Sequence, residues 1–462
     1  MTEGNLRRQI IFFALPVFIG NLFQQMYNTV DSLIVGNFLG QKALAAVTST
    51  GSLTFLLVGF FVGFSNGASV IVARQIGTRK EEAVEQAVHT AMALGITCGV
   101  LMTLLGVLGS PWLLEVMQTP KDVMGDAQLY LTVYFAGSFF LVMYNMMVGI
   151  LQAAGDSRHP LYYLVFSSLL NIGLDTLFIG GFKMGVEGAA LATIISEAVS
   201  MTLCLVRLMR VRDIYRVRPA RIRFVGLYLR KILLQGFPTA LQMTVIDIGN
   251  ILIQAYINTF GSLAMAGIGA YCKVEGFCFL PVVSFSVAVT TFVSQNLGAG
   301  KHERIRKGIA FSLVCAVLLI EVIGIAMYIL APHLVGAFNS DPRVIAYGAG
   351  RAHVCCLFFF LLGFSHVSSA VMRGLGKPIV PTVIMMICWC AVRVICVLTI
   401  GQMVHSIQLT YWLYPATWLL SSVWFAILLW RMLLKNRGSA VKISQELIPG
   451  NEEALEDISD IS

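Results

Sequence analysis

The chain has 462 residues, of which 57% are hydrophobic and only 12% are charged, and its formal net charge is +8. Soluble domains average about 45–50% apolar and about 25% charged residues, so this composition excludes an ordinary soluble protein. Apolar stretches of about 20 residues or more recur along the chain, and each is long enough to cross a bilayer.

Twelve apolar stretches are expected to be transmembrane helices, because lipid offers no partner to free backbone polar groups. They are residues 8–38, 44–73, 82–109, 122–153, 158–180, 187–209, 230–260, 265–295, 302–330, 343–372, 377–400 and 408–434. The predicted fold class is therefore an all-α integral membrane protein with twelve transmembrane helices.

The two halves of the chain repeat each other at an offset of 221 residues. The matching pairs are Phe64 and Phe285, Ser65 and Ser286, Val72 and Val293, Gly77 and Gly298, Lys80 and Lys301, Glu82 and Glu303, Gly155 and Gly376, and Pro160 and Pro381. A shift of one residue extends the match to Pro16 and Pro238. A duplicated, very apolar chain is typical of transporters whose substrate site lies between two repeats.

The repeat divides the chain into four parts. Residues 1–209 and 230–434 form two six-helix lobes, and the even number of spans in each gives a parallel pseudo-two-fold repeat about an axis along the membrane normal. Residues 210–229 form a basic linker, for which we prefer the surface of an anionic leaflet over a nucleic-acid arm. Residues 435–462 form an acidic tail that is poor in aromatics and is expected to be disordered.

The distribution of basic residues predicts the orientation. Of the 32 Lys and Arg residues, four follow odd-numbered spans (Lys42, Lys121, Lys183 and Arg343) and three lie within spans (Lys273, Arg351 and Arg393). The remaining 25 lie in the N-terminus, in the loops after even-numbered spans and in the tail. Cytoplasmic loops carry the excess of basic residues, so both termini are expected in the cytoplasm of a multi-pass plasma-membrane protein.

Four polar residues of the first half are expected at one depth. At about 1.5 Å per helical residue, Asp31, Asn171, Asp175 and Thr193 all lie roughly 7–13 Å below the outer surface. A charged residue at a helix centre costs about 2.5–3.5 kcal/mol on insertion scales, so it needs a reason to persist. Two carboxylates, an amide and a hydroxyl are suitable ligands for a hard cation such as Na⁺, or members of a proton relay.

A polar stripe supports a function for Asp31. Gln24, Tyr27 and Asn28 follow one face of the same span at helical spacing. The alternative is that these polar groups, together with Glu197, only hold helices together by hydrogen bonds. Pro16 and Pro238 lie early in the first span of each half, where proline either marks a bending point or occupies a tolerated first-turn position.

The second half has a different polar set, namely Asp247, Lys273, Glu275, His366 and Arg393. Asp247 and Glu275 could pair with Lys273 across the first two spans of this half, an arrangement that is either structural or functional. His366 is either a hydrogen-bonded packing residue or a proton-sensitive group. The residue that matches Asp31 is Leu252 or Ile253, so the second half has no copy of the acid.

The sequence resembles the multidrug and toxic compound extrusion family over roughly residues 8–434. The resemblance is carried by Pro16–Asp31 with Val35–Gly36 and Leu39–Gly40, Gln75–Gly77, Gly155–Pro160, Asn171–Asp175, Gln295–Lys301, Arg373–Pro378, and Tyr414–Pro415 with Trp418. It implies a two-lobe exporter of twelve helices, driven by inward movement of Na⁺ or H⁺.

The resemblance also implies roles for individual residues. Asp31 corresponds to the central coupling aspartate, and Pro16 corresponds to the proline that kinks the first helix. Asn145, Asn171, Asp175 and Thr193 correspond to the other polar positions of the family's first-lobe site. Some members use acids in helices 7 and 10 instead. The tenth span here has no acid, so we favour coupling in the first lobe.

We therefore expect a secondary active antiporter that exports amphipathic, cationic organic compounds by alternating access, in exchange for H⁺ or Na⁺. It is expected to act as a monomer in the lipid bilayer, with small organic substrates, no cofactor and no nucleic-acid partner. The alternative within the same superfamily is a flippase for a lipid-linked head group. An intramembrane enzyme is not favoured, because no span carries HExxH or an evident Ser/His pair.

Overall fold

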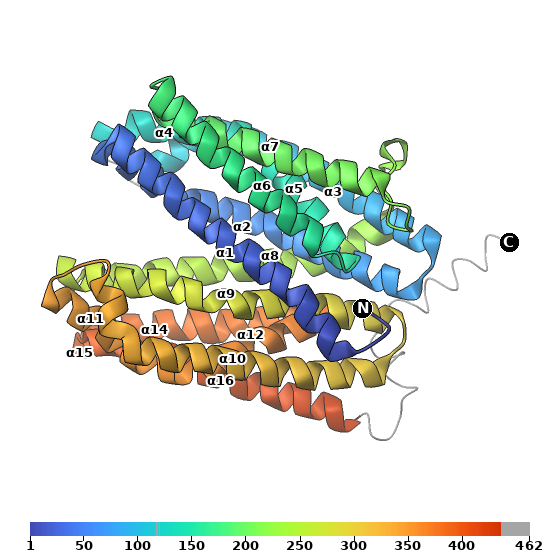
Figure 1. Cartoon of the computed structure of the whole chain (residues 1–462). Helices are drawn as coiled ribbons and strands as arrows, with labels where there is room; N and C mark the ends of the chain where they lie inside the picture. Colours follow the sequence, from blue (N-terminus) through green and yellow to red (C-terminus); the bar gives the residue numbers. More distant parts are fainter. Residues whose placement is uncertain (117–118, 120, 436–462) are drawn as a thin grey trace.

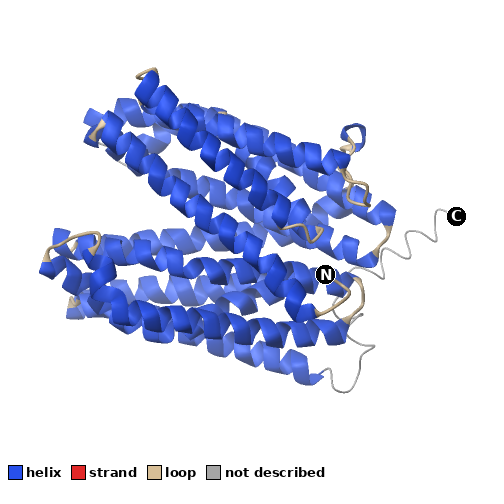
Figure 2. Ribbon diagram, in the orientation of Figure 1, coloured by secondary structure: helices blue, strands red, loops and turns tan. Residues whose placement is uncertain are grey.

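The computed structural model describes residues 1–116, 119 and 121–435, and in that part of the chain every regular element is a helix (Figure 2). The predicted acidic tail lies outside the described residues, except for Lys435. The helices form two bundles, one from each half of the chain (Figure 1). The predicted all-α fold with two lobes is confirmed.

The first lobe contains six spans. They are α1 (Leu6–Leu39), α2 (Gln41–Thr78), α3 (Glu81–Val116), α4 (Lys121–Ala136) followed by α5 (Ser138–Ala153), α6 (Arg158–Asp175) continued by the π-helical η1 (Thr176–Gly181), and α7 (Val186–Arg210). The fourth span bends by 47° between α4 and α5. The bend lies at Gly137, which packs so closely on Ile194 that a Cβ would collide with it.

The second lobe repeats this arrangement after the linker, which contains the short η2 (Pro219–Arg221). Its elements are α8 (Gly226–Asn258), α9 (Ser262–Gly298), α10 (His302–Gly336), α11 (Pro342–Cys355), η3 (Cys356–Phe358), α12 (Phe359–Gly374), α13 (Ile379–Met385), the π-helical η4 (Met386–Ala391), α14 (Val392–Leu398), α15 (Ile400–Val404) and α16 (Ile407–Lys435). The elements from α11 to α12 form the tenth span, and those from α13 to α15 form the eleventh.

The described helices are long enough to cross a membrane. Ten continuous helical runs pass a test of length and apolar composition, and the bent pair α4–α5 adds an eleventh. The remaining span is α2, a helix of 38 residues that packs against α8, α9 and α5. Together these elements make the twelve spans expected from the sequence, although some helices, such as α2, α3 and α10, extend several residues beyond the apolar stretches.

The first helix of each half begins in the core of the other half. Ile10, Phe13, Ala14 and Val17, near the start of α1, belong to the buried cluster that contains Phe292 and other second-lobe residues. Conversely, Tyr228 and Ile232, near the start of α8, are buried in the first-lobe core. The later part of α1 returns to the first lobe, where Val35 is buried with Tyr130. Figure 1 shows α1 crossing from one bundle to the other.

The lobes touch most closely at the end of the molecule where α1 and α8 begin, which we call the linker end. Here α2 crosses α9, and a Cβ at Gly77 would collide with the carbonyl oxygen of Gln295. The repeat-related Gly298 makes the equivalent approach to the carbonyl oxygen of Arg74. Nearer the opposite end, a Cβ at Gly59 of α2 or at Gly276 of α9 would meet no atom within 4 Å. The lobes are therefore closed at the linker end and more open beyond it.

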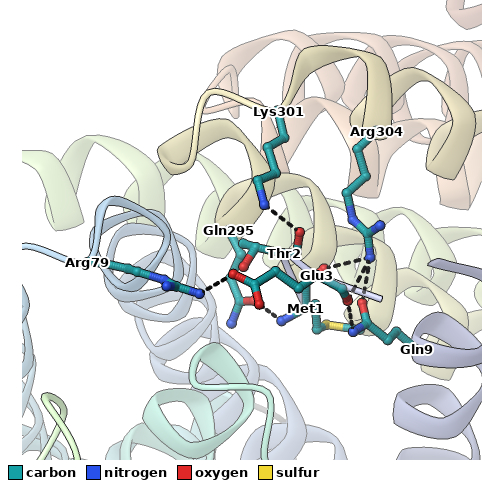
Figure 3. Close-up of polar contacts among 8 residues, drawn as sticks. All are labelled: Met1, Thr2, Glu3, Gln9, Arg79, Gln295, Lys301 and Arg304. Carbon is teal, nitrogen blue, oxygen red and sulfur yellow. Dashed lines mark hydrogen bonds and ion pairs between the residues drawn. The ribbon is translucent and has the colours of Figure 1, made fainter. Parts of the chain in front are cut away.

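The N-terminal residues lie across this closed end (Figure 3). The carboxylate of Glu3 is 2.5 Å from Arg79, which follows α2 of the first lobe. Lys301, just before α10 of the second lobe, donates to the carbonyl oxygen of Thr2 at 2.9 Å. Arg304 of α10 donates to the carbonyl oxygen of Gly4 at 2.7 Å and to Gln9 Oε1 at 2.7 Å. These N-terminal residues, Thr2 to Gly4 and Gln9, therefore connect the two lobes, and we call them the N-terminal strap.

Candidate functional site

Two acids from different helices meet inside the first lobe. Asp31 lies on α1 and Asp175 ends α6, and their carboxyl groups lie next to each other. Asp175 is fully buried and Asp31 is half-buried. The chain positions Asp175 at the junction of α6 with the π-helical η1, a local widening that is frequent at functional sites.

Asn171 and Thr193 complete this acid cluster. Asn171 lies one turn before Asp175 on α6 and is 1% exposed. In the amide orientation that satisfies both neighbours, Asn171 donates to Asp175 Oδ2 at 3.0 Å and accepts from the backbone N–H of Thr193 at 3.3 Å. The Thr193 hydroxyl donates to the carbonyl oxygen of Ala189 at 3.1 Å, so its lone pairs remain free to accept. The structure thus brings together the four residues that we expected at one depth.

The acid cluster needs a positive partner. Two unit charges about 4 Å apart repel by about 4 kcal/mol at an effective dielectric constant of about 20. A contact between two carboxyl groups is therefore stable only with a proton on one of them or a cation beside them. Asp31 Oδ1 and Asp175 Oδ1 are both buried and lack a hydrogen-bond partner within the described part of the chain. These two oxygens are the atoms available to bind a proton or a hard cation.

Aromatic hydroxyls and a third acid surround the cluster, and among them Tyr130 and Tyr134 were not predicted from the sequence. Tyr130 and Tyr134 of α4 stack with their ring centroids 6.2 Å apart. Tyr130 lies within electrostatic range of Asp31 and Asp175, and Tyr27 lies within range of Asp31 and Glu197. Glu197 Oε2 is buried without a partner among the described residues. Tyr27 could be predicted because it lies one turn from Asp31 on the same helix. Tyr130 and Tyr134 could not, because they reach the cluster only through the packing of α4.

The other candidates of the first lobe lie outside this group. Gln24 and Asn28 are exposed on α1, on the same stripe as Tyr27. Asn145 is half-buried, and its amide donates to the Leu141 carbonyl oxygen of its own helix at 2.9 Å. Pro16 lies inside the continuous helix α1, within the segment that packs in the second-lobe core. Any bend at Pro16 would therefore change how α1 connects the lobes.

The expected pairing of Asp247 and Glu275 with Lys273 is wrong. Lys273 is exposed and lies 5.9 Å over the ring of Phe338, and neither acid forms an ion pair with it in the described structure. Glu275 instead accepts a hydrogen bond of 3.0 Å from the hydroxyl of Tyr271, one turn earlier on α9. Lys273 and Glu275 are two residues apart on one helix, and residues at that spacing do not face each other.

The remaining second-lobe candidates are packed among aromatic rings. His366 lies between Phe279 and Trp389, with ring centroids 4.6 and 5.1 Å away. Arg393 of α14 is 2% exposed and donates through Nε to Thr417 Oγ1 at 2.9 Å. Arg351, which was not predicted as a site residue, is equally buried and lies against the ring of Tyr414, which Arg393 also contacts.

Comparison with known proteins agrees with this architecture. The MatE family model matches residues 16–177 and 238–398, one match in each half. The probable multidrug resistance protein YpnP of Bacillus subtilis is 28% identical over 392 residues, which are 85% of this chain and 88% of the relative. YoeA of the same organism, another probable multidrug resistance protein, is 28% identical over 391 residues, which are 83% of this chain and 84% of the relative.

A solved structure shares the whole fold. A mutant of the Vibrio cholerae MATE transporter VcmN superposes with a TM-score of 0.86 and 21% sequence identity, over 93% of this chain and 97% of that one. The two family matches together cover most of the sequence and respect the repeat that divides it. The chain therefore belongs to the MatE family of membrane transporters.

Proposed function

We propose that this transporter is a secondary active antiporter, which exports amphipathic, cationic organic compounds in exchange for inward movement of H⁺ or Na⁺. The observation that carries the proposal is the buried contact of Asp31 with Asp175, whose free oxygens suit a cation or a proton. The names of the relatives, probable multidrug resistance proteins, support organic compounds as substrates.

In the proposed mechanism, α1 links cation binding to movement of the lobes. Its outer part carries Asp31 in the first lobe, while its first turns are buried in the second lobe and Asn21 donates to Ser284 of α9 at 3.3 Å. A cation that neutralises the acid pair favours the arrangement of α1 in which the two acids remain in contact. A cation can shift the equilibrium between two lobe arrangements only if it binds one arrangement more tightly than the other. The surroundings of Asp31 must therefore differ between the two arrangements.

The closed linker end and the more open opposite end correspond to an outward-facing state, if the linker is cytoplasmic as the basic residues predict. Release of the cation toward the cytoplasm then requires the lobes to separate at the crossing of α2 and α9. We place the protein in the plasma membrane as a monomer with both termini in the cytoplasm, and we assign it small organic substrates and no cofactor.

The flippase alternative is not supported by the position of the basic residues. A passage for a lipid-linked head group needs basic side chains along the surface between the lobes. Arg351 and Arg393 are each 2% exposed within the second lobe, so they do not line such a surface. Lys273 is exposed but lies over Phe338 of the same lobe.

Transport by purified protein in sealed liposomes tests the proposal. The liposomes carry a pH gradient, a Na⁺ gradient, both or neither, and movement of a fluorescent organic cation such as ethidium is followed. We expect transport only with a gradient, and we expect Asp31→Asn to abolish it while leaving insertion intact. Asp247→Asn is the matched control, since it changes a half-buried acid at the equivalent helix of the other lobe. Gradient-driven transport by the Asp31→Asn protein at the wild-type rate would contradict the assignment.

A further inference from the structure

The second lobe buries two arginines against one tyrosine. Arg351 of α11 and Arg393 of α14 have their Cζ atoms 4.4 and 4.1 Å from the ring centroid of Tyr414. Both side chains are 2% exposed. Because they share one aromatic ring, the two Cζ atoms are at most 8.5 Å apart, which is the largest separation that one small ion in contact with both groups can span. We call Arg351, Arg393 and Tyr414 the arginine cluster.

The charge of the arginine cluster is not balanced. Arginine stays protonated in proteins, so the cluster carries two positive charges. Glu275 lies within electrostatic range of both arginines, but it forms an ion pair with neither in the described structure and is bonded to Tyr271. Cys272 and Cys355 also lie within electrostatic range of Arg351, and the Cys355 thiol donates to the carbonyl oxygen of Tyr411 at 3.5 Å. A single acid leaves at least one buried positive charge, which is costly without a counter-ion.

Each arginine also retains a free donor. Arg393 uses Nε to bind Thr417, yet its Nη2 is buried and has no hydrogen-bond partner among the described residues. Arg351 Nε is likewise buried without a partner in that part of the chain. Buried N–H groups on a charged side chain are normally satisfied, so two orphaned donors in one cluster indicate a missing acceptor.

Two members of the arginine cluster occupy repeat positions at or beside the acid cluster of the first lobe, whereas Arg393 corresponds to Ile172. At the 221-residue offset, Arg351 corresponds to Tyr130, Tyr414 to Thr193, and Thr417 to Ser196. Tyr130 and Thr193 adjoin Asp31 and Asp175 in the first lobe. The duplicated scaffold therefore presents free oxygens in one lobe and free N–H donors in the other.

We propose that the arginine cluster binds one small monovalent inorganic anion, of the size of chloride, between Arg351 and Arg393. One negative charge neutralises the excess that Glu275 leaves, and a spherical acceptor can take both free donors. The burial of both side chains excludes an extended organic anion. The site is separate from the proposed cation site, and its test measures binding, so it does not depend on whether antiport is correct.

Binding of radioactive chloride and thermal unfolding of the purified protein test the site. We expect saturable binding of one chloride per chain, and a midpoint that rises by several degrees when gluconate is replaced by chloride at constant Na⁺. Bromide should act like chloride, whereas sulfate should not. Arg393→Gln and Arg351→Gln should each lower the affinity at least tenfold. Lys273→Gln is the matched control, because it removes an exposed base of the same lobe and should leave binding unchanged.

Three results would overturn the proposal. The first is a wild-type protein that binds no chloride and unfolds at the same midpoint in chloride and gluconate. The second is chloride binding that both arginine variants keep at the wild-type affinity. The third needs no variant and therefore does not depend on variant folding: crystals of the wild type grown in bromide would show no anomalous peak between Arg351 and Arg393.

Discussion

Asp31 and Asp175 are contributed by helices that are far apart in the sequence, yet they form one chemical group. Their unpartnered oxygens and the Thr193 hydroxyl offer the oxygen ligands that hard cations prefer, and the Asn171 amide holds Asp175 in place by donating to it. The second lobe has no acid at the position of Asp31, because the matching residue is Leu252 or Ile253. The two lobes are therefore expected to respond differently to cations.

Removal of both first-lobe acids should eliminate stabilisation by cations. We expect Na⁺ or a change of pH to shift the unfolding midpoint of the wild type, since a ligand that binds the folded state stabilises it by mass action. The Asp31→Asn, Asp175→Asn protein should show a flat response. The Asp247→Asn, Glu275→Gln protein is the comparison and should keep the shift. The opposite outcome, with the response lost only in the second-lobe variant, would place the cation site in α8 and α9.

The sequence predicted the acid cluster because depth along a helix follows directly from residue number. It could not predict which residues of other helices face the cluster, so Tyr130 and Tyr134 were missed. The proposed pairing of Glu275 with Lys273 failed because residues two apart on one helix do not face each other, a constraint that the residue numbers already contain. The repeat offers one signal for Arg351, because it aligns Arg351 with Tyr130, which lies beside the acid cluster of the first lobe.

At the scale of helices, the crossing of α2 and α9 is formed by two repeat-related glycines. Gly77 and Gly298 let each backbone approach the carbonyl oxygen of the other helix, at Gln295 and at Arg74. A methyl group at either position would force the helices apart, because a backbone oxygen cannot rotate away as a side chain can. The crossing therefore depends on the absence of a side chain.

Gly77→Ala and Gly298→Ala should each open the linker end. Spin labels on cysteines that replace Lys80 and Glu303, in a background without the ten native cysteines, report the distance between the lobes there. We expect a larger population of long distances in both variants. Gly59→Ala and Gly276→Ala are the matched controls on the same two helices, since their added methyl groups meet no atom within 4 Å. An unchanged distance distribution in Gly77→Ala would show that the crossing is not held closed by close packing.

The number and order of the spans could be predicted because lipid permits only helices of sufficient length. The local departures could not. The bend between α4 and α5 depends on contact of Gly137 with Ile194 of α7, and the π-helical segments η1 and η4 have no periodic signal. Likewise, nothing in the apolar pattern of α1 and α8 shows that their first turns are buried in the opposite lobe.

At the scale of the whole molecule, the orientation in the membrane is open to direct measurement. Single cysteines are introduced into the cysteine-free background and treated on intact cells with a thiol reagent that does not cross membranes. We expect labelling at Ser262 and Asp341 and none at Arg216, because the basic linker should face the cytoplasm. Reaction at Arg216 would reverse the orientation and the proposed outward-facing state.

The N-terminal strap should favour closure of the linker end by a modest amount. Arg304→Gln removes the donor to Gly4 and weakens the contact with Gln9. Exposed charged contacts contribute about 0.2–1 kcal/mol, so the ratio of closed to open lobes should fall by at most about fivefold. The same spin-label pair measures this ratio. Arg306→Gln, a change of an exposed arginine on the same helix, should leave the ratio unaltered, and equal effects of the two changes would rule out the strap.

The exchange of first turns between the lobes has a consequence for how the protein is made. Tyr228 and Ile232 complete the first-lobe core, so a ribosome must finish the start of α8 before that lobe can close. The apolar face around Ile10 and Phe13 can be buried only later, after the helices of the second lobe have been inserted. We therefore expect neither half to assemble when expressed alone, whereas two fragments divided within residues 210–225 and produced together should find each other. By the same reasoning, an ancestor of half this length would have folded only as a dimer, in which the first turns of each chain's first helix packed in the core of the other chain.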